Sequence, residues 1–591
     1  MNNSIFIQPQ NHDVTCTFVD DNNNIRTFEY DRWKNKKWCR LHFYESPGRD
    51  KTTQNQLIEE SIINLIEFLT YTKTFKKKEP VTKCFILMNG LSDDLNRGCT
   101  RAELLCNTIS KVFPNTDMYF HPYHHYAHAA VAYYQSPKQF EKSLIFSYDG
   151  SGFTSLKRKE FNVRNVETFM NKAAPLWRTG LLFYGYNYNK PIKYITSKCL
   201  HYGGVYTEIS KNIKINWPGG SRRTLSKVNK RLSSPGKFMG YTGYGKPIPN
   251  LVERYKDFIL NKSDNNQPIY ALRTRNTKKF NNQRPWKETK KELIRYIEKI
   301  PKDEVENHAA SFQLAFEEAI IEIIIPIVQK HKLPLILTGG CALNVLVNQR
   351  ITKICKQMGL DTFVCNNPSD SGLSLGQLFL EFPHHNQSLT YSGLPMMDDI
   401  QPYFEKYNIK EKTIAQLVQK IKDGYIIGCA NDNSELGPRA LGNRSIICKP
   451  DPGMKDKLNS KIKFREWFRP FAPVCRLQDK DKFFIDAYES PYMTLSPIVR
   501  KKYRDQLVSI THVDGSARLQ TVTNEQNSFL YELLTEMENQ NLLPVILNTS
   551  FNIKGKPILT TYDSAFEALE ETQLDYIFLD KKYLISKEDK L

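Results

Sequence analysis

The stretch HPYHHYAHAAVAYY, residues 121–134, is followed closely by LIFSYDGSG at residues 144–152. His124 and His128 are four residues apart, so on a helix both imidazoles lie on one face, one turn apart. Such a pair can hold one metal ion and leave it open positions, although packed or surface histidines on an amphipathic helix are the alternative. The apolar run that ends at Asp149 predicts a strand that delivers a carboxylate into a glycine turn, which favours the metal site.

The composition indicates an intracellular chain of more than one domain. With 591 residues the chain is too long for one compact core. The net charge of +20 favours anionic partners, although lysine-rich solubility is an alternative explanation. Twelve scattered cysteines without a CxxC pair are typical of reduced cytosolic thiols. We expect a cytoplasmic protein without a signal peptide, and the most apolar run, at 319–328, is too short to span a bilayer.

The N-terminal third predicts a mixed α/β sheet. Three strands fall within residues 1–34, a helix at 55–69, a buried strand at 82–90 and a helix at 101–113. This order is that of a ribonuclease-H or actin-type sheet, whose duplicated form binds nucleotides between two halves.

Two later strands end in glycine turns. LPLILTGGCALN (333–344) reads as a buried strand, a Gly-Gly turn and a helix start, whose exposed amides suit phosphate or ribose. VCNNPSDSGLSLG (364–376) repeats this pattern and places Asp370 between a strand and a glycine turn. We therefore interpret Asp149 and Asp370 as matched positions in two halves of one fold. With the two histidines they form a candidate metal site.

A polar linker at 383–395 separates a second domain that is rich in anion-binding signals. Arg439 and Arg444 lie close to two glycines, aromatic residues are interleaved with Lys463 and Arg469, and Arg518 lies three residues after a glycine. Guanidinium groups match phosphate oxygens bidentately, which predicts a ligand site. For two further cations, Lys461 and Arg465, we favour surface salt bridges. The glycine-rich stretch PGKFMGYTGYGKP (235–247) predicts backbone close to a ligand, with an irregular surface loop as the alternative.

Taken together, nine motifs resemble the O-carbamoyltransferases of the nodulation-protein U and cephalosporin or tobramycin carbamoyltransferase type. The motifs are HHYAH (124–128), DGSG (149–152), GKFMGYTGYG (236–245), GGCALN (339–344), DSGLSLG (370–376), GPRALGNRS (437–445), KIKFREWFRPFAP (461–473), HVDGSARLQT (512–521) and ILNTSFNIKGKPI (546–558).

The resemblance implies an α/β protein of two domains. Residues 1–390 would form a duplicated ribonuclease-H/actin-like domain of the sugar kinase superfamily, similar to threonylcarbamoyl-transfer proteins. Residues 391–591 would form a YrdC-like domain that binds carbamoyl phosphate and ATP. Carbamate released from carbamoyl phosphate would attack ATP to give carbamoyladenylate, and the carbamoyl group would then pass to an acceptor hydroxyl of a sugar or secondary metabolite. The family also makes a homodimer an expectation.

The resemblance also implies roles for individual residues. The metal ligands would be His124, His128, Asp149 and Asp370; Fe2+ is favoured, Mn2+ and Zn2+ are alternatives, and Mg2+ would accompany ATP. Catalytic and carbamoyl phosphate-binding roles would fall to His12, Lys463, Arg469 and Arg518. Nucleotide-binding roles would fall to Gly150, Gly152, Gly236, Lys237, Gly240, Gly339, Gly340, Asn344, Arg439, Arg444, Asn548 and Ser550.

Two other functions are alternatives to carbamoyl transfer. The basic charge suggests a tRNA-modifying enzyme that joins both threonylcarbamoyl steps, although the chain has no recognisable RNA-binding module. A non-enzymatic nucleotide-binding regulator is the third reading. Where the family carries a glutamate-rich segment, this chain reads EYDRWKNKKW (29–38), so Glu29, Arg32 and Lys36 receive no role.

Overall fold

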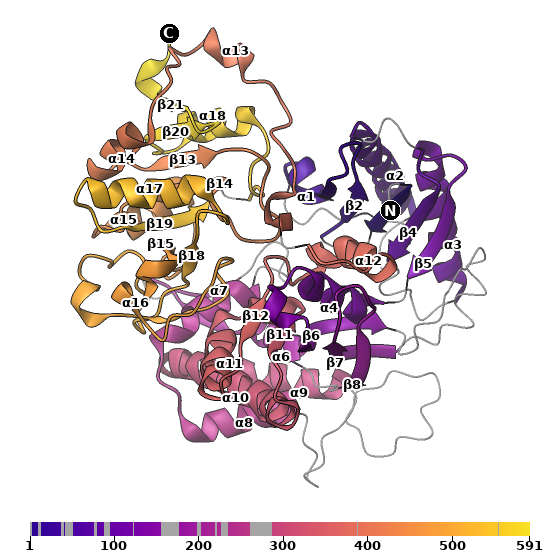
Figure 1. Ribbon diagram of the computed structural model, residues 1–591. Helices are drawn as coiled ribbons and strands as arrows, with labels where there is room; N and C mark the ends of the chain where they lie inside the picture. The colour runs from indigo at the N-terminus through magenta and orange to yellow at the C-terminus, as the bar shows by residue number, and fades with distance from the viewer. Residues whose placement is uncertain are drawn as a thin grey trace.

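The structure is a computed structural model that places most of the chain. It describes residues 3–9, 13–36, 41, 51–75, 80–87, 95–121, 123–154, 176–197, 202–218, 221–225, 234–260, 286–386, 388–553 and 555–591. Figure 1 shows two neighbouring sheets in the N-terminal part, residues 1–390, and a third sheet in the C-terminal part, residues 391–591.

The first sheet has five strands in the order β3-β2-β1-β4-β5. They are β1 (Ser4–Gln8), β2 (Thr15–Val19), β3 (Ile25–Glu29), β4 (Lys83–Leu87) and β5 (Asp117–His121). The first three strands pair antiparallel, and β4 and β5 run parallel to β1. Both faces are covered: Ile5 and Ile7 of β1 belong to the core that includes Phe68, whereas Phe6 faces a second core. This double burial explains why these strands are apolar on both faces.

The second sheet repeats the first. Its order is β12-β11-β6-β7-β8, and its antiparallel and parallel pairs match those of the first sheet. The strands are β6 (Ser143–Thr154), β7 (Leu176–Gly185), β8 (Lys193–Ser197), β11 (Leu335–Thr338) and β12 (Thr362–Val364). The predicted duplicated mixed α/β arrangement is therefore confirmed by topology.

One prediction about the duplication is wrong. Asp149 lies in β6 and Asp370 follows β12, so both belong to the second sheet rather than to matched positions in two halves. The strand that corresponds to β12 in the first sheet is β5. Helix α4 (His124–Tyr134) begins just after β5, so the histidines, not Asp149, occupy the place in the first half that Asp370 has in the second.

Helices α4 and α12 (Leu373–Glu381) lie between the two sheets (Figure 1). Helix α12 contacts β1 and β2, and α4 contacts β6 and β11. The two helices touch each other, and a Cβ built on Gly376 would lie 2.1 Å from the carbonyl oxygen of Ala127. This agrees with the small residues of α4, which allow a close helix neighbour. The contact brings the His-bearing helix over β6.

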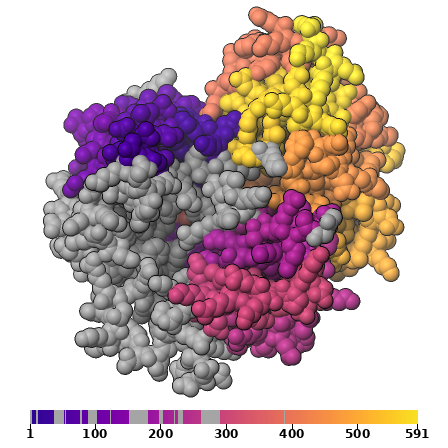
Figure 2. Space-filling view, turned by 180° about the vertical axis from the view of Figure 1, so that it is seen from behind, coloured from indigo at the N-terminus to yellow at the C-terminus, as the bar shows by residue number. Residues whose placement is uncertain are grey.

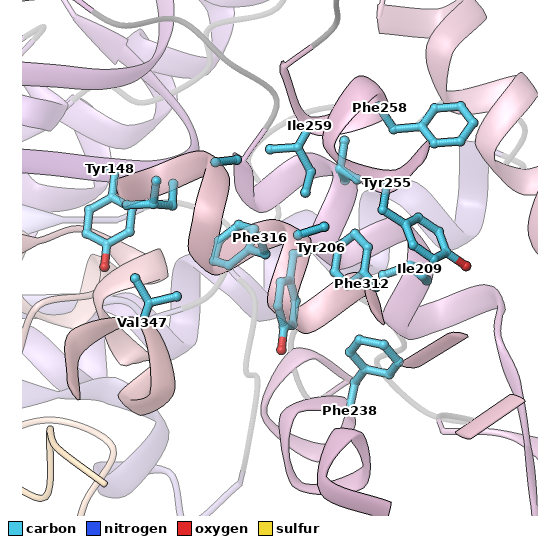
Figure 3. Close-up of a cluster of buried hydrophobic side chains, with 14 of the residues drawn as sticks. Tyr148, Tyr206, Ile209, Phe238, Tyr255, Phe258, Ile259, Phe312, Phe316 and Val347 are labelled. Carbon is cyan, nitrogen blue, oxygen red and sulfur yellow. The ribbon is translucent and has the colours of Figure 1, made fainter. Parts of the chain in front are cut away.

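The outer face of the second sheet is filled by an aromatic core. Figure 3 shows Tyr206, Phe238, Phe312 and Phe316 clustered in this core, and the rings of Tyr206 and Phe316 are 4.9 Å apart. The long helix α10 (Val305–His331) supplies two of these rings. The helices of the N-terminal part not yet named are α1 (Tyr30–Trp33), α2 (Lys51–Lys73), α3 (Leu95–Val112), α6 (Tyr202–Asn212), α7 (Ser234–Tyr241), α8 (Pro249–Leu260), α9 (Trp286–Glu298) and α11 (Val345–Gln357).

The C-terminal part is built on a seven-stranded sheet in the order β18-β15-β19-β14-β13-β20-β21. The strands are β13 (Ile427–Ala430), β14 (Arg444–Cys448), β15 (Ala472–Arg476), β18 (Gln520–Val522), β19 (Val545–Ser550), β20 (Tyr576–Leu579) and β21 (Tyr583–Ser586). Its helices are α13 (Gln401–Phe404), α14 (Ile414–Lys422), α15 (Met454–Lys457), α16 (Lys480–Phe483), α17 (Ser528–Asn539) and α18 (Tyr562–Glu571).

The C-terminal part packs on the second half. Both views show it beside the lobe that carries α7 (Figures 1 and 2), and the rings of Tyr241 and Phe468 meet across the boundary at 5.3 Å. Short hairpins β9 (Lys214–Asn216) with β10 (Arg222–Thr224) and β16 (Phe484–Ile485) with β17 (Ile498–Val499) lie outside the main sheets. Among the described helices, none combines the length and apolar character needed to cross a membrane. The nine cysteines whose side chains the structure describes are free thiols.

Candidate functional site

Four side chains from three elements converge beneath α4. His124 and His128 project from that helix, Asp149 from the middle of β6, and Asp370 from the turn before α12. The prediction that the strand ends in a glycine turn at Asp149 is wrong, because β6 continues to Thr154. One ligand atom from each residue lies within 4.8 Å of all the others. The two histidine Nε2 atoms are 3.1 Å apart, and His124 Nε2 is 3.1 Å from Asp149 Oδ2. The structure therefore brings the four predicted ligands together.

The site is buried, and its imidazole and carboxylate groups face one another. The two histidines are at most 1% exposed, and Asp149 and Asp370 expose 13% and 17% of their side chains. Burial opposes ionisation of Asp149, but the hydrogen bond with His124 and the nearby His128 hold the pKa of Asp149 below its ordinary value. Two imidazoles and two carboxylates that point at one another fit a divalent cation of the Fe(II), Mn(II) or Zn(II) type.

A Gly-Gly turn fixes the orientation of Asp149. The amide of Gly340 donates to Asp149 Oδ1 over 3.0 Å. Gly339 has φ +91°, and a Cβ there would lie 2.2 Å from the carbonyl oxygen of Tyr148. Only glycine lets the turn approach the strand this closely. The sequence pattern predicted a nucleotide cradle here, and the structure adds a different contact: the second glycine amide holds a candidate metal ligand.

A second cluster, in the C-terminal part, consists of four arginines. We call Arg439, Arg465, Arg469 and Arg518 the arginine cluster. Burial lowers the pKa of Arg518 well below its ordinary range, and the charges of the other three arginines lower it further. Burial and the charge of Arg469 lower the pKa of Arg439 to about 10. The cluster remains reachable, because 36% of the Arg469 side chain is exposed.

Mutual repulsion in the arginine cluster is compensated only in part by the protein, through the single carboxylate of Glu466 among the described residues. Like charges in a poorly hydrated place raise the free energy of the folded state unless an anion joins them. Among the described residues, Arg518 Nε and Arg465 Nη2 are buried atoms without a hydrogen-bond partner. The arrangement therefore suits an anion with several oxygens, such as a phosphate.

The interpretation of Arg465 as a surface salt-bridge residue is wrong. Its guanidinium lies 4.2 Å from the ring centroid of Phe471, and its Nε donates to Asn459 Oδ1 over 2.6 Å. Burial first, and then the charge of Arg469, lower its pKa well below the ordinary range. Among the described residues it makes no ion pair. The aromatic ring and the asparagine hold it in the cluster, which residue spacing alone did not indicate.

Lys463 and Ser550 form a separate polar group at the end of β19. Lys463 Nζ donates to the carbonyl oxygens of Ser550 (2.5 Å) and Asn552 (2.9 Å). Asn548, also on β19, is fully buried and donates to the carbonyl of Ala440 (3.1 Å), next to Arg439. Lys463 is thus engaged with the backbone, and Asn548 supports the loop that carries one arginine of the cluster.

Arg444 and Asn344 are occupied by internal contacts. Arg444 is fully buried and donates to the backbone carbonyls of Asn431, Asp432 and Asn443. Burial lowers its pKa to about 10. It holds the loop before β14 and does not join the arginine cluster, so the predicted nucleotide contact has no support from its position. Asn344 caps α11 through Val347 N (3.2 Å) and bonds Gln313.

The glycine-rich stretch of α7 lies at the boundary between the two parts. The carbonyl of Gly240 is 2.9 Å from His512 Nε2, and a Cβ on Gly240 would lie 3.2 Å from Pro470. Gly236, by contrast, has open space where a Cβ would be. Lys237 forms an ion pair of 2.7 Å with Glu466. The stretch therefore packs against the loop that bears the arginine cluster.

Two further glycines that were predicted as site residues follow Asp149 in the same strand. Gly150 and Gly152 fall within β6 beyond Asp149. His12 lies outside the described residues. Glu466 was not singled out from the sequence, because an acidic residue inside a basic stretch reads as an ordinary local salt bridge.

The fold and the two clusters define a two-part α/β protein with a candidate metal centre and a candidate anion site. The family descriptions "Carbamoyltransferase N-terminus" and "Carbamoyltransferase C-terminus" match residues 50–378 and 418–587. The chain belongs to the carbamoyltransferase family and is a transferase enzyme.

Three relatives illustrate the family. Nodulation protein NolNO of Sinorhizobium fredii is 29% identical over 79% of this chain and 64% of its own length. Nodulation protein U of Rhizobium tropici is 31% identical over 48% of this chain and 49% of its own. The 3'-hydroxymethylcephem-O-carbamoyltransferase of Amycolatopsis lactamdurans is 37% identical over 38% of this chain and 43% of its own.

Proposed function

We propose that the protein is an ATP-dependent O-carbamoyltransferase with its chemistry divided between two sites. The arginine cluster would bind carbamoyl phosphate and the phosphates of ATP, and the His-Asp site would serve transfer to an acceptor hydroxyl. The observation that carries this proposal is the presence, in one carbamoyltransferase-family chain, of four crowded arginines and a separate cluster of two histidines and two aspartates. Residues 391–591 would be the YrdC-like domain, and residues 1–390 the transfer domain.

The first step would join two anions. Water would hydrolyse carbamoyl phosphate to carbamate and inorganic phosphate. A carbamate oxygen would then attack the α-phosphorus of ATP, and pyrophosphate would leave. Carbamoyladenylate is the product. The repulsion between carbamate and ATP is the main barrier that a protein can lower, and fixed guanidinium groups in a poorly hydrated place lower it effectively. Arg439, Arg465, Arg469 and Arg518 are placed to do so.

The second step would move the carbamoyl group to an alcohol. The acceptor oxygen would attack the carbamoyl carbon, the bond to the AMP phosphate would break, and the hydroxyl proton would pass to water. A divalent cation held by His124, His128, Asp149 and Asp370 would supply Lewis acidity for this step. Asp149 is kept oriented by Gly340, and its lowered pKa keeps it ionised as a ligand at neutral pH. The relative that acts on a hydroxymethylcephem supports a small-molecule hydroxyl as the acceptor.

The division of labour can be tested with two variants. Purified protein is given carbamoyl phosphate and ATP, and pyrophosphate, AMP and the carbamoylated acceptor are measured, with acceptors screened by a carbamoyl mass increment. We expect Arg518→Ala to abolish pyrophosphate release. We expect His128→Ala to retain pyrophosphate release and lose transfer. If both variants lose pyrophosphate release equally, the two-site division is wrong.

A further inference from the structure

One carboxylate is shared between the two parts of the molecule. Glu466 Oε1 is 2.7 Å from Nζ of Lys237 on α7, and Glu466 Oε2 is 3.6 Å from Nη1 of Arg469. The Lys237 and Glu466 side chains are 20% and 14% exposed. The carboxylate of Glu466 therefore pairs with Lys237 of the N-terminal part and also contacts Arg469, a member of the arginine cluster.

Glu466 has an electrostatic effect on that cluster. Among the described residues it is the one carboxylate whose charge raises the pKa values of Arg465 and Arg469. A carboxylate beside an anion site repels the incoming anion and competes with it for the guanidinium groups. Without Lys237, Glu466 would have only arginines of the cluster to pair with.

Packing places Lys237 beside Glu466. Lys237 Nζ also donates to the carbonyl of Leu225 over 3.2 Å. The helix that carries it is docked on the C-terminal part through Gly240, whose carbonyl meets His512, and through Tyr241 against Phe468. Lys237 therefore reaches Glu466 only while α7 is packed against the loop that bears the cluster.

We propose that Lys237 is a positioning residue that completes the anion site of the C-terminal part from the N-terminal part. It neutralises Glu466, so that Arg469 is left to bind the phosphate group of the ligand. The proposal rests on the proposed function of the arginine cluster and adds a form of regulation: affinity for the phosphate group depends on the docking of α7.

The test is a double-mutant cycle read by calorimetric titration with inorganic phosphate on the full chain. We expect Lys237→Met to weaken phosphate binding about 3- to 10-fold, because the charge of Glu466 is then uncovered. Glu466→Gln should bind phosphate at least as well as the wild type. In the Glu466→Gln background, Lys237→Met should change the affinity less than about twofold. In steady-state AMP formation, the same pattern should appear in KM for carbamoyl phosphate, with kcat retained.

The control is a second ion pair that bridges the same two parts. Lys353 Nζ lies 2.7 Å from Asp486 Oδ2, with both side chains more exposed and neither among the groups that act on the arginines. Lys353→Met should leave phosphate affinity unchanged. The proposal is overturned if Lys237→Met weakens phosphate binding equally in the wild-type and Glu466→Gln backgrounds. It is also overturned if Lys237→Met weakens phosphate binding in neither background. Failure of the proposed function looks different: wild-type phosphate binding would then be absent or unaffected by Arg518→Ala.

Discussion

At the scale of single residues, the two clusters show opposite electrostatic designs. Two imidazoles and two carboxylates each offer one ligand atom within 4.8 Å of the others, a set of donors that favours a cation. The four arginines repel one another, and each loses hydration in the folded protein. The first arrangement is stable as a binding site for a cation, whereas the second becomes favourable only when an anion arrives. In the folded protein, the arginines therefore repel one another at the place where the phosphate group of the proposed ligand would bind.

A substitution in the His-Asp site should be visible in metal content. Asp149→Asn removes one negative charge and one strong ligand, so we expect metal affinity to fall at least about tenfold. Metal content measured by mass spectrometry after incubation with Fe2+, Mn2+ or Zn2+, and the gain in Tm on adding each ion, check this. Asp361→Asn, which alters an exposed ion pair with Lys356, is the matched control and should retain the metal. Equal metal loss in both variants would contradict the assignment.

At the scale of elements, close backbone approaches position the site. Gly376 lets α12 meet α4, and the Gly339-Gly340 turn lets β11 end against β6. These contacts bring the His-bearing helix, Asp149 and Asp370 to one point, although Asp370 lies more than 200 residues further along the chain than the other ligands. A side chain at Gly376 or at Gly339, in place of the glycine hydrogen, would push the candidate metal ligands apart.

The Gly-Gly turn provides a quantitative test. Gly339→Ala introduces a Cβ 2.2 Å from a backbone oxygen, at φ +91°. Gly359→Ala has a similar φ of +72° but open space around the new methyl. We expect Gly359→Ala to lower the free energy of unfolding by about 1 kcal/mol through backbone strain. Gly339→Ala should lower the free energy of unfolding by about 2 kcal/mol more than Gly359→Ala does, and it should weaken metal binding. Chemical denaturation of both variants measures this, and equal costs would show that the turn relaxes freely.

At the scale of the whole molecule, the C-terminal part is tied to both halves of the N-terminal part. Lys237 reaches it from the second half, and α1 reaches it from the first. The guanidinium of Arg32 donates to the carbonyls of Glu435 and Gly437, each over 2.5 Å, and Glu29 accepts from the amide of Gly437. Residues left without a role by the sequence thus join the first sheet to the loop that precedes Arg439.

This junction should make stability depend on pH. Burial raises the pKa of Glu29 from 4.5 to about 6, although Arg32 opposes the shift. Between these pH values the folded state binds more protons than the unfolded state, so the contribution of Glu29 to stability falls as pH rises from about 4.5 to 6. We expect Glu29→Gln to flatten the fall in Tm over this window. The wild type and the variant are compared by thermal unfolding from pH 4 to 7; parallel curves would contradict the assignment.

What the sequence by itself determined was local in character. The spacing of His124 and His128 on one helix face, the strand that carries Asp149 and the succession of strands and helices in residues 1–113 depend on periods of a few residues, which the backbone obeys wherever it lies. The tertiary structure decided which charges meet. It placed Arg465 in the cluster, kept Arg444 in internal contacts, put both aspartates in one sheet and paired Lys237 with Glu466. The physical reason is that the pairing and hydration of a charged side chain depend on the groups packed around it, and the tertiary structure decides which groups those are.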